Sequence, residues 1–199
     1  MSPDLINQAI TIFDSFDKWN AFIELSNARE SIKVKYFEKL KQELINKFNR
    51  NDFRKDWAFK IITHNLYRWY LKDYGPDSIC IVWRQDDTVL WSNIISVDVQ
   101  MAINLLNTPD FNSIFNCFDN TDTFSNTFPH HYCEEKHRYE FNDSTSYSGI
   151  TEQNFDKLSW FAGNKTDEMI NQISMKINRF RTPEITALLM ELNRRCKKS

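Results

Sequence analysis

The chain has 199 residues, of which 41% are hydrophobic and 15% aromatic, and this composition suits one domain with a substantial core. The net charge is −2, and the four cysteines contain no CxxC pair, which excludes a zinc ribbon and a thioredoxin-type redox pair. No apolar run is long enough to cross a membrane, and the first residues lack a signal-peptide pattern. We therefore expect a cytoplasmic protein with reduced thiols.

Helical periodicity opens the chain, and we predict N-terminal helices over residues 4–49. A first apolar stripe has three- and four-residue steps: Leu5, Ile6, Ala9, Ile10 and Phe13. A longer stripe, widened by Phe37 and Ile45, predicts a second helix: Ile32, Tyr36, Leu40, Leu44 and Phe48. Lysines, Lys33 among them, lie between the members of this stripe, so we interpret them as the solvated face of an amphipathic helix.

Strand-type alternation follows, and it predicts an antiparallel sheet over about residues 56–92. Apolar and polar positions alternate in two runs: Trp57, Phe59 and Ile61, then Tyr67, Trp69 and Leu71. Turn-forming residues at 73–78 precede a further run at 79–83. Short connections leave no room for crossover helices, so we predict a meander of three or four strands. We interpret its aromatic side chains as core rather than as a platform for stacking nucleic-acid bases.

Residues 96–141 form a mixed middle region. A helix near Ser96 would place Val97, Met101 and Leu105 on one face, and Thr108 before Pro109 predicts a capped start for the next short helix. Residues 119–128 are loop-like, and strand-type patterning returns over 130–141.

In the C-terminal region, residues 151–197, threonine caps and apolar periodicity predict three helices that begin at threonines 151, 166 and 182. Their expected inner faces consist of apolar side chains: Phe155, Leu158 and Trp160; Ile170, Ile173, Ile177 and Phe180; and Ile185, Leu188, Leu189 and Leu192. The predicted fold class is therefore α+β, a single domain over 1–199 in which an antiparallel β-meander packs with N-terminal and C-terminal helices.

Residues 110–156 are acidic: they contain nine acidic and two basic residues, a net charge of 2 − 9 = −7. This segment would repel a phosphate backbone and attract a basic protein, so we expect a basic protein partner and no direct nucleic-acid binding. The candidate contact residues are Asp119, Asp122, Glu134 and Glu135. A solvated acidic loop is the alternative.

Three of the four histidines and one cysteine lie within residues 129–141. On a strand, His131, Cys133 and His137 share a face, and their side chains are of the types that bind zinc. No partner motif occurs elsewhere in the chain, and a charged edge strand explains the same pattern. We therefore favour no metal site and no cofactor, and keep zinc as an alternative.

The same stretch also permits a nuclease interpretation. Glu134 and Lys136 match the E-x-K half of the PD-(D/E)xK pattern, and Asp110 or Asp77 would supply the preceding aspartate. Two carboxylates would then hold Mg²⁺ while the lysine orients the attacking water. Nucleotide binding by a glycine-rich loop is excluded, because the chain has only 3 glycines, at positions 75, 149 and 163.

Four segments of the chain resemble an uncharacterised bacterial protein family: KWNAFIEL from Lys18, WYLKDYG from Trp69, LSWFAGN from Leu158 and FRTPEITALL from Phe180. That family comprises small standalone proteins and domains associated with PD-(D/E)xK-type nucleases in defence-related loci. The resemblance implies an accessory or sensing module rather than a catalyst. We therefore predict a cytosolic bacterial protein-interaction or accessory module, in a defence- or toxin-related setting, with the Mg²⁺-dependent nuclease as the alternative.

Overall fold

The computed structural model describes residues 3–50, 52–53, 55–63, 66–84, 87–93, 95–117 and 152–198. Four strands form one sheet: β1 (Trp57–Thr63), β2 (Leu66–Leu71), β3 (Cys80–Arg84) and β4 (Asp87–Trp91). The strand order is β1-β2-β3-β4, and each neighbouring pair is antiparallel. The predicted α+β class with an antiparallel meander is thus confirmed.

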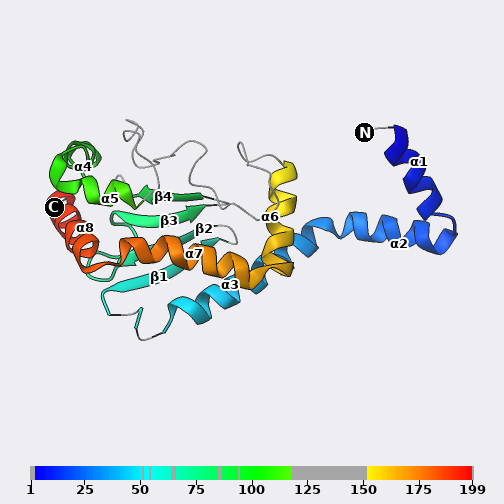
Figure 1. Cartoon of the computed structure of the whole chain (residues 1–199), viewed down its shortest axis with the longest axis horizontal. Helices are drawn as coiled ribbons and strands as arrows, with labels where there is room; N and C mark the ends of the chain where they lie inside the picture. The colour runs from blue at the N-terminus through cyan, green and yellow to red at the C-terminus, as the bar shows by residue number, and fades with distance from the viewer. Residues whose placement is uncertain are drawn as a thin grey trace.

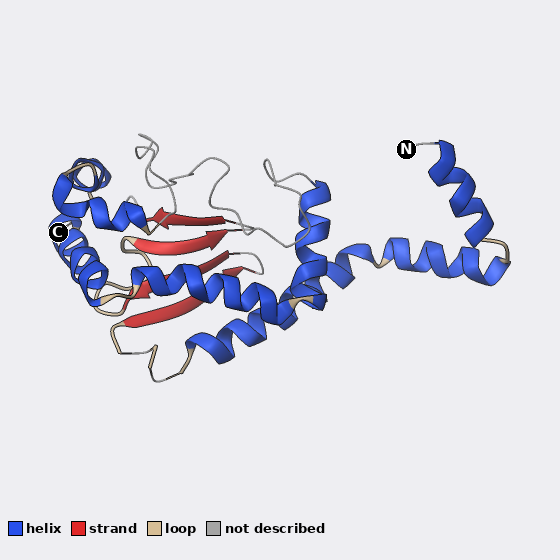
Figure 2. Cartoon of the chain, in the orientation of Figure 1, coloured by secondary structure: helices blue, strands red, loops and turns tan. Residues whose placement is uncertain are grey.

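Some helices precede the sheet in the sequence and the others follow it (Figure 1; Figure 2). Three precede it: α1 (Pro3–Ile12), α2 (Phe16–Asn27) and α3 (Arg29–Phe48). The others follow it: α4 (Val99–Leu106), the 3₁₀ helix η1 (Pro109–Phe111), α5 (Asn112–Asn116), α6 (Glu152–Asn164), α7 (Thr166–Phe180) and α8 (Pro183–Cys196).

The sheet contributes its aromatic residues to the core. Tyr67, Trp69 and Trp83 are fully buried, and Trp57 is 3% exposed. The rings of Tyr67 and Trp83 stack with centroids 5.0 Å apart, and Trp69 lies opposite Phe59 in the β1–β2 register. Alternate side chains on a strand point to the same face, so one face of the sheet becomes a continuous apolar layer. The prediction that these aromatic residues form core is confirmed.

Helix α3 packs on this layer through Leu40, Leu44 and Phe48 as predicted, but its N-terminal half buries neighbours of the predicted residues. Its buried residues are Lys33, Phe37, Leu40, Leu44 and Phe48. Ile32 and Tyr36 are only half-buried, and the prediction that Lys33 is solvated was wrong. The lysine is tolerated inside because two carboxylates pair with it, as described below.

The C-terminal helices complete the core, and their predicted inner faces are largely confirmed. Ile173, Ile177 and Phe180 of α7 are fully buried, as is Leu192 of α8. Trp160 of α6 is an exception, because 48% of it is exposed while Leu158 and Phe161 are buried. Thr182 caps α8 as predicted, its side chain accepting from the Ile185 N–H at 3.2 Å.

The middle region differs from its prediction. Helix α4 begins at Val99 with Asp98 as its cap, and Val97 instead forms an isolated bridge with Lys197. Met101 is 38% exposed, because the buried face of α4 consists of Ala102, Leu105 and Leu106. The Thr108 hydroxyl donates to Leu105 O at 2.7 Å and so does not cap the following turn.

Candidate functional site

The first two helices form an extension that we call the arm, residues 3–27. In Figure 1 the arm projects away from the sheet and from the other helices. Eight of its large apolar side chains are 40–76% exposed: Ile6, Ile10, Ile12, Phe16, Trp19, Phe22, Ile23 and Leu25. None of the residues of α2, all of which the structure describes, is buried. The helix predicted from the stripe at residues 5–13 exists, but its stripe does not face the core.

Local interactions explain why the arm is helical without a core to pack on. Ser15 caps α2, its side chain accepting from the Lys18 N–H at 3.3 Å. Phe13, in the turn between the two helices, packs on Phe22 with ring centroids 4.6 Å apart and on Trp19 at 6.0 Å. This small aromatic cluster sets α1 at an angle to α2.

The arm is joined to α3 through a single residue, Ala28, which ends one helix and begins the next. Ala28 keeps a right-handed helical conformation, with φ −85° and ψ −1°. Its N–H donates to Glu24 O at 2.9 Å, and its carbonyl accepts from the Ile32 N–H at 3.0 Å. Because helical hydrogen bonds continue on both sides of Ala28, α2 continues outward from the start of α3 with only a kink.

A pocket of about 410 Å³ lies at the base of the arm, where α2, α3 and α6 meet. Its lining combines apolar, aromatic and charged side chains: Phe22, Leu25, Ser26, Arg29, Ile32, Lys33, Tyr36, Asp156, Ser159 and Trp160. The exposed ring of Trp160 therefore extends the apolar surface of the arm onto α6.

Charged groups at this pocket form one connected cluster. The Lys33 ammonium lies 2.5 Å from Asp156 Oδ1 and 2.7 Å from Glu30 Oε1, and the guanidinium of Arg29 also pairs with Asp156. Burial raises the pKa of the Asp156 carboxyl, but its hydrogen bonds with Lys33 and Arg29 outweigh that effect and leave the pKa lowered. Burial lowers the pKa of Lys33, yet the hydrogen bonds to Asp156 and Glu30 leave it raised. The cluster stays ionised at neutral pH and ties α3 to α6.

Close packing of α3 against α6 fixes the walls of the pocket. A Cβ added to Gly163 would lie 2.1 Å from Cδ1 of Tyr36, so only glycine fits at this crossing. The Lys39 ammonium donates to Gly163 O at 2.7 Å, beside the same contact. The base of the arm is therefore rigid even though the arm itself projects outward.

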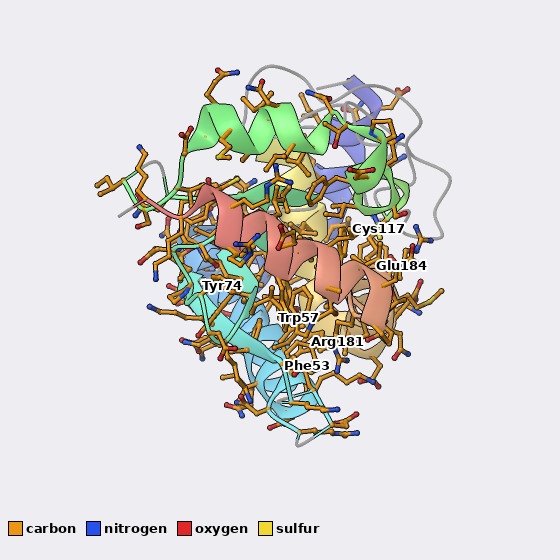
Figure 3. The ribbon with its side chains drawn as sticks, turned by 90° about the vertical axis from the view of Figure 1, so that its left-hand side faces the viewer. Phe53, Trp57, Tyr74, Cys117, Arg181 and Glu184 are labelled. Atoms are coloured by element: carbon orange, nitrogen blue, oxygen red, sulfur yellow. The ribbon has the colours of Figure 1, made fainter. Side chains whose placement is uncertain are left out.

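The opposite end of the molecule carries a partly buried thiol, Cys117, and an arginine, Arg181 (Figure 3). Burial raises the pKa of the Cys117 thiol to about 11, so this cysteine is a poor nucleophile at neutral pH, although Glu184 lies near it in Figure 3. Arg181 lies over the ring of Phe53, 4.2 Å from its centroid, and donates to Asp52 O at 3.1 Å (Figure 3). Both groups serve packing rather than chemistry.

Almost all residues predicted as site residues lie outside the described part of the chain. These are Asp119, Asp122, His131, Cys133, Glu134, Glu135, Lys136 and His137. Asp110, from the nuclease hypothesis, is exposed on η1, and Asp77 is exposed and paired with Arg68 at 3.0 Å. The acidic contact surface, the zinc set and the nuclease triad therefore remain predictions. Among the described residues, no three His, Cys, Asp or Glu side chains are grouped to hold a metal ion.

Comparison with known proteins adds no family to this description. No protein-family model matches the chain, and no curated protein or solved structure matches it. Within the described ranges, no helix has the length and apolar character needed to cross a membrane.

Sequence reasoning missed the arm as a functional feature. The residue pattern predicts an amphipathic helix, but periodicity does not say what covers the apolar face. The available signal was the density of large apolar residues in α2, where five of them occur within ten positions, 16–25.

Proposed function

We propose that this chain is a protein-interaction module that binds its partner through the arm. The observation that carries the proposal is the set of eight large apolar side chains, 40–76% exposed, that occur within one projecting helical element. Monomeric soluble proteins rarely expose such a patch unless another surface covers it. Helix-in-groove recognition uses this kind of element, an amphipathic helix that places its apolar face in a partner's groove.

The charge of the arm favours a protein partner over a membrane or a nucleic acid. Residues 3–28 contain four acidic side chains and one basic one, a balance of 1 − 4 = −3. Helices that bind lipid surfaces carry lysine and arginine on their polar face, and nucleic acids need basic contacts to their phosphates. An acidic, aromatic-rich helix instead suits a protein surface that combines apolar and basic residues.

The pocket at the base of the arm strengthens this proposal. Trp160, Phe22 and Arg29 are of the residue types that dominate binding energy in protein interfaces. The ion pair with Asp156 holds the side chain of Arg29, so less conformational entropy is lost at this residue when a partner docks.

The proposal extends the functional prediction made from the sequence. We propose a cytosolic bacterial accessory module in a defence- or toxin-related setting, and the acidic segment 110–156 would offer a second contact to a basic partner. The Mg²⁺-dependent nuclease, with Asp110, Glu134 and Lys136, remains the alternative, to be tested by DNA cleavage that EDTA stops and Glu134→Ala abolishes.

Site-specific photocrosslinking in living cells tests the proposal. A photoreactive phenylalanine analogue replaces Phe16 in one variant, and Met175 in the control, because Met175 is 67% exposed on the remote helix α7. We expect one or a few adducts of defined mass from position 16 and none of the same mass from position 175. The proposal is wrong if position 16 gives no adduct or only those of the control.

A further inference from the structure

We infer that the partner of the arm is a second copy of this chain, whose docking site is the groove between α3 and β1. This inference rests on the proposed function and names the surface that the arm covers. Two reciprocal contacts, each arm in the groove of the other copy, would close a twofold dimer.

The groove has the chemistry that the arm requires. Its volume is about 530 Å³, and its apolar lining consists of Val34, Ile45, Phe59, Ile61 and Ile62. Val34 and Ile62 are 45% and 36% exposed, so apolar surface lies open at both walls. The polar lining includes Lys41, Lys60 and Glu38, a balance of 2 − 1 = +1.

Charge favours arm-to-groove contact over arm-to-arm contact. The arm carries −3 over residues 3–28, whereas the charged side chains that line the groove, Lys41, Lys60 and Glu38, have a balance of +1. Two arms packed on each other would bring like charges together, which costs free energy at an interface. The opposite signs of arm and groove attract each other.

The apolar area of the arm contributes to a dimer interface. Three of the eight exposed residues are aromatic: Phe16, Trp19 and Phe22, which are 76%, 48% and 40% exposed. At roughly 150–250 Å² for a whole aromatic side chain, their exposed parts present on the order of 300 Å². A stable interface buries about 800 Å² on each partner, and the aliphatic residues of the arm and the groove of the same copy add to this area.

The lengths of the helices bring arm and groove into register. A helix rises about 1.5 Å per residue, so the centre of α2 and the centre of the groove-lining part of α3, residues 34–49, are about 30 Å apart along the helix. If two α2–α3 units lie antiparallel about an axis near Ile32, Phe16 of one copy falls opposite Lys47 of the second copy. Asn27 then falls opposite Tyr36 of the second copy. The whole of α2 would thus lie along the groove.

The arm cannot reach the groove of its own chain while α2 and α3 stay helical through Ala28. The arm leaves from the N-terminal end of α3 and points away from the sheet (Figure 1), whereas the groove lies beside β1 along residues 34–49 of α3. A second copy supplies the missing surface without any change in the helices.

Sedimentation velocity of the full chain from about 1 to 100 µM tests this inference. We expect wild type to reach the mass of a dimer. Phe16→Gln combined with Ile23→Gln removes apolar area from the arm without changing its charge, and Val34→Gln combined with Ile62→Thr does the same in the groove. Each double variant should raise the dissociation constant about 100-fold or more. The control, Met175→Gln, should dimerise as wild type does.

Mixing the two double variants distinguishes arm-to-groove from arm-to-arm packing. A mixed pair keeps one intact arm and one intact groove, so we expect association between the variants that neither shows alone. Circular dichroism spectra equal to wild type establish that each variant is folded. A groove variant that still dimerises overturns the inference.

The oligomeric state also separates this inference from the proposed function. A monomeric wild type whose position 16 crosslinks to a different protein overturns the inference and leaves the proposed function standing. A monomer that gives no specific adduct overturns both.

Discussion

At the scale of single residues, two glycines are required for different physical reasons. Gly163 lies where α6 crosses α3, and its missing side chain lets Tyr36 approach. Gly75, in the turn after β2, has φ +79°, but nothing lies within 4 Å of an added Cβ. One position is limited by space and the other by backbone conformation.

We expect Gly163→Ala to lower the free energy of unfolding by about 1–3 kcal/mol, because the ring of Tyr36 and the helix behind it must shift. Gly75→Ala should cost about 1–2 kcal/mol from the left-handed backbone alone. Urea denaturation measures both losses. Asparagine distinguishes the causes: Gly75→Asn should recover part of the loss, because asparagine tolerates positive φ, while Gly163→Asn should be worse than alanine. Equal effects of asparagine at both positions would contradict this account.

The Asp156 cluster predicts a dependence of stability on pH. Because the folded pKa of Asp156 is lowered, its contribution is present above the ordinary aspartate value of about 4 and is lost as pH falls through the folded value. The raised pKa of Lys33 adds a contribution that is present below about 10 and lost at higher pH. The stabilisation should therefore form a plateau between these limits.

We expect Asp156→Asn to lower the free energy of unfolding by about 1–2 kcal/mol at pH 7, because Lys33 stays buried and loses a carboxylate while Asp156 is partly screened by water. Urea denaturation of both proteins from pH 7 to pH 3 should show the difference shrinking below about pH 4. The control is Asp14→Asn, which removes an exposed pair with Lys18 and should cost under about 0.5 kcal/mol. A difference that does not change with pH would be inconsistent with an ionic role.

At the scale of elements, one side chain joins α8 to the sheet. The amide of Asn193, 3% exposed, accepts from the Ile79 N–H at 2.8 Å and donates to Ile79 O at 3.0 Å. It also donates to Leu189 O at 2.9 Å within its own helix. The side chain thus replaces a strand partner for the residue just before β3.

We expect Asn193→Leu to lower the free energy of unfolding by about 2–4 kcal/mol, because it leaves buried backbone groups of Ile79 without their amide partner. The exposed Asn104 of α4 provides the control, and Asn104→Ala should change stability by less than about 0.5 kcal/mol. Urea denaturation gives both values. A loss under about 1 kcal/mol for Asn193→Leu would show that other groups or water satisfy Ile79.

At the scale of the whole molecule, the same substitution should cost much more stability in the core than in the arm. Phe37 of α3 is fully buried in the core, whereas Phe16 is 76% exposed on the arm. We expect Phe37→Ala to cost about 3–5 kcal/mol of unfolding free energy, from lost burial and the cavity left behind. Phe16→Ala should cost under about 0.5 kcal/mol when measured at concentrations where the chain is monomeric. Similar losses at both positions would mean that the arm is part of the core.

The local elements could be predicted because each of them depends on neighbours in the sequence. Alternation at Tyr67, Trp69 and Leu71 identifies a half-buried strand, and the Thr182-Pro183 pair marks the start of α8. The fold class followed from the order of these elements. The errors arose where two interpretations share one pattern. The N-terminal half of α3 buries Lys33 rather than Ile32, and Met101 lies on a helix that begins later than predicted.

The sequence by itself determined the α+β class, the meander and the inner faces of the last two helices, because hydrophobic periodicity and capping act over a few residues. Only the tertiary structure decided which apolar stripe remains uncovered. The stripe at Ile6 and Ile10 has the pattern of a core-facing one, yet its residues are 47% and 65% exposed, because α1 and α2 project away from the sheet and the helices that the structure describes. Burial depends on what meets a face in space, and residues far apart in the chain, such as Asp156 beside Lys33, supply that surface.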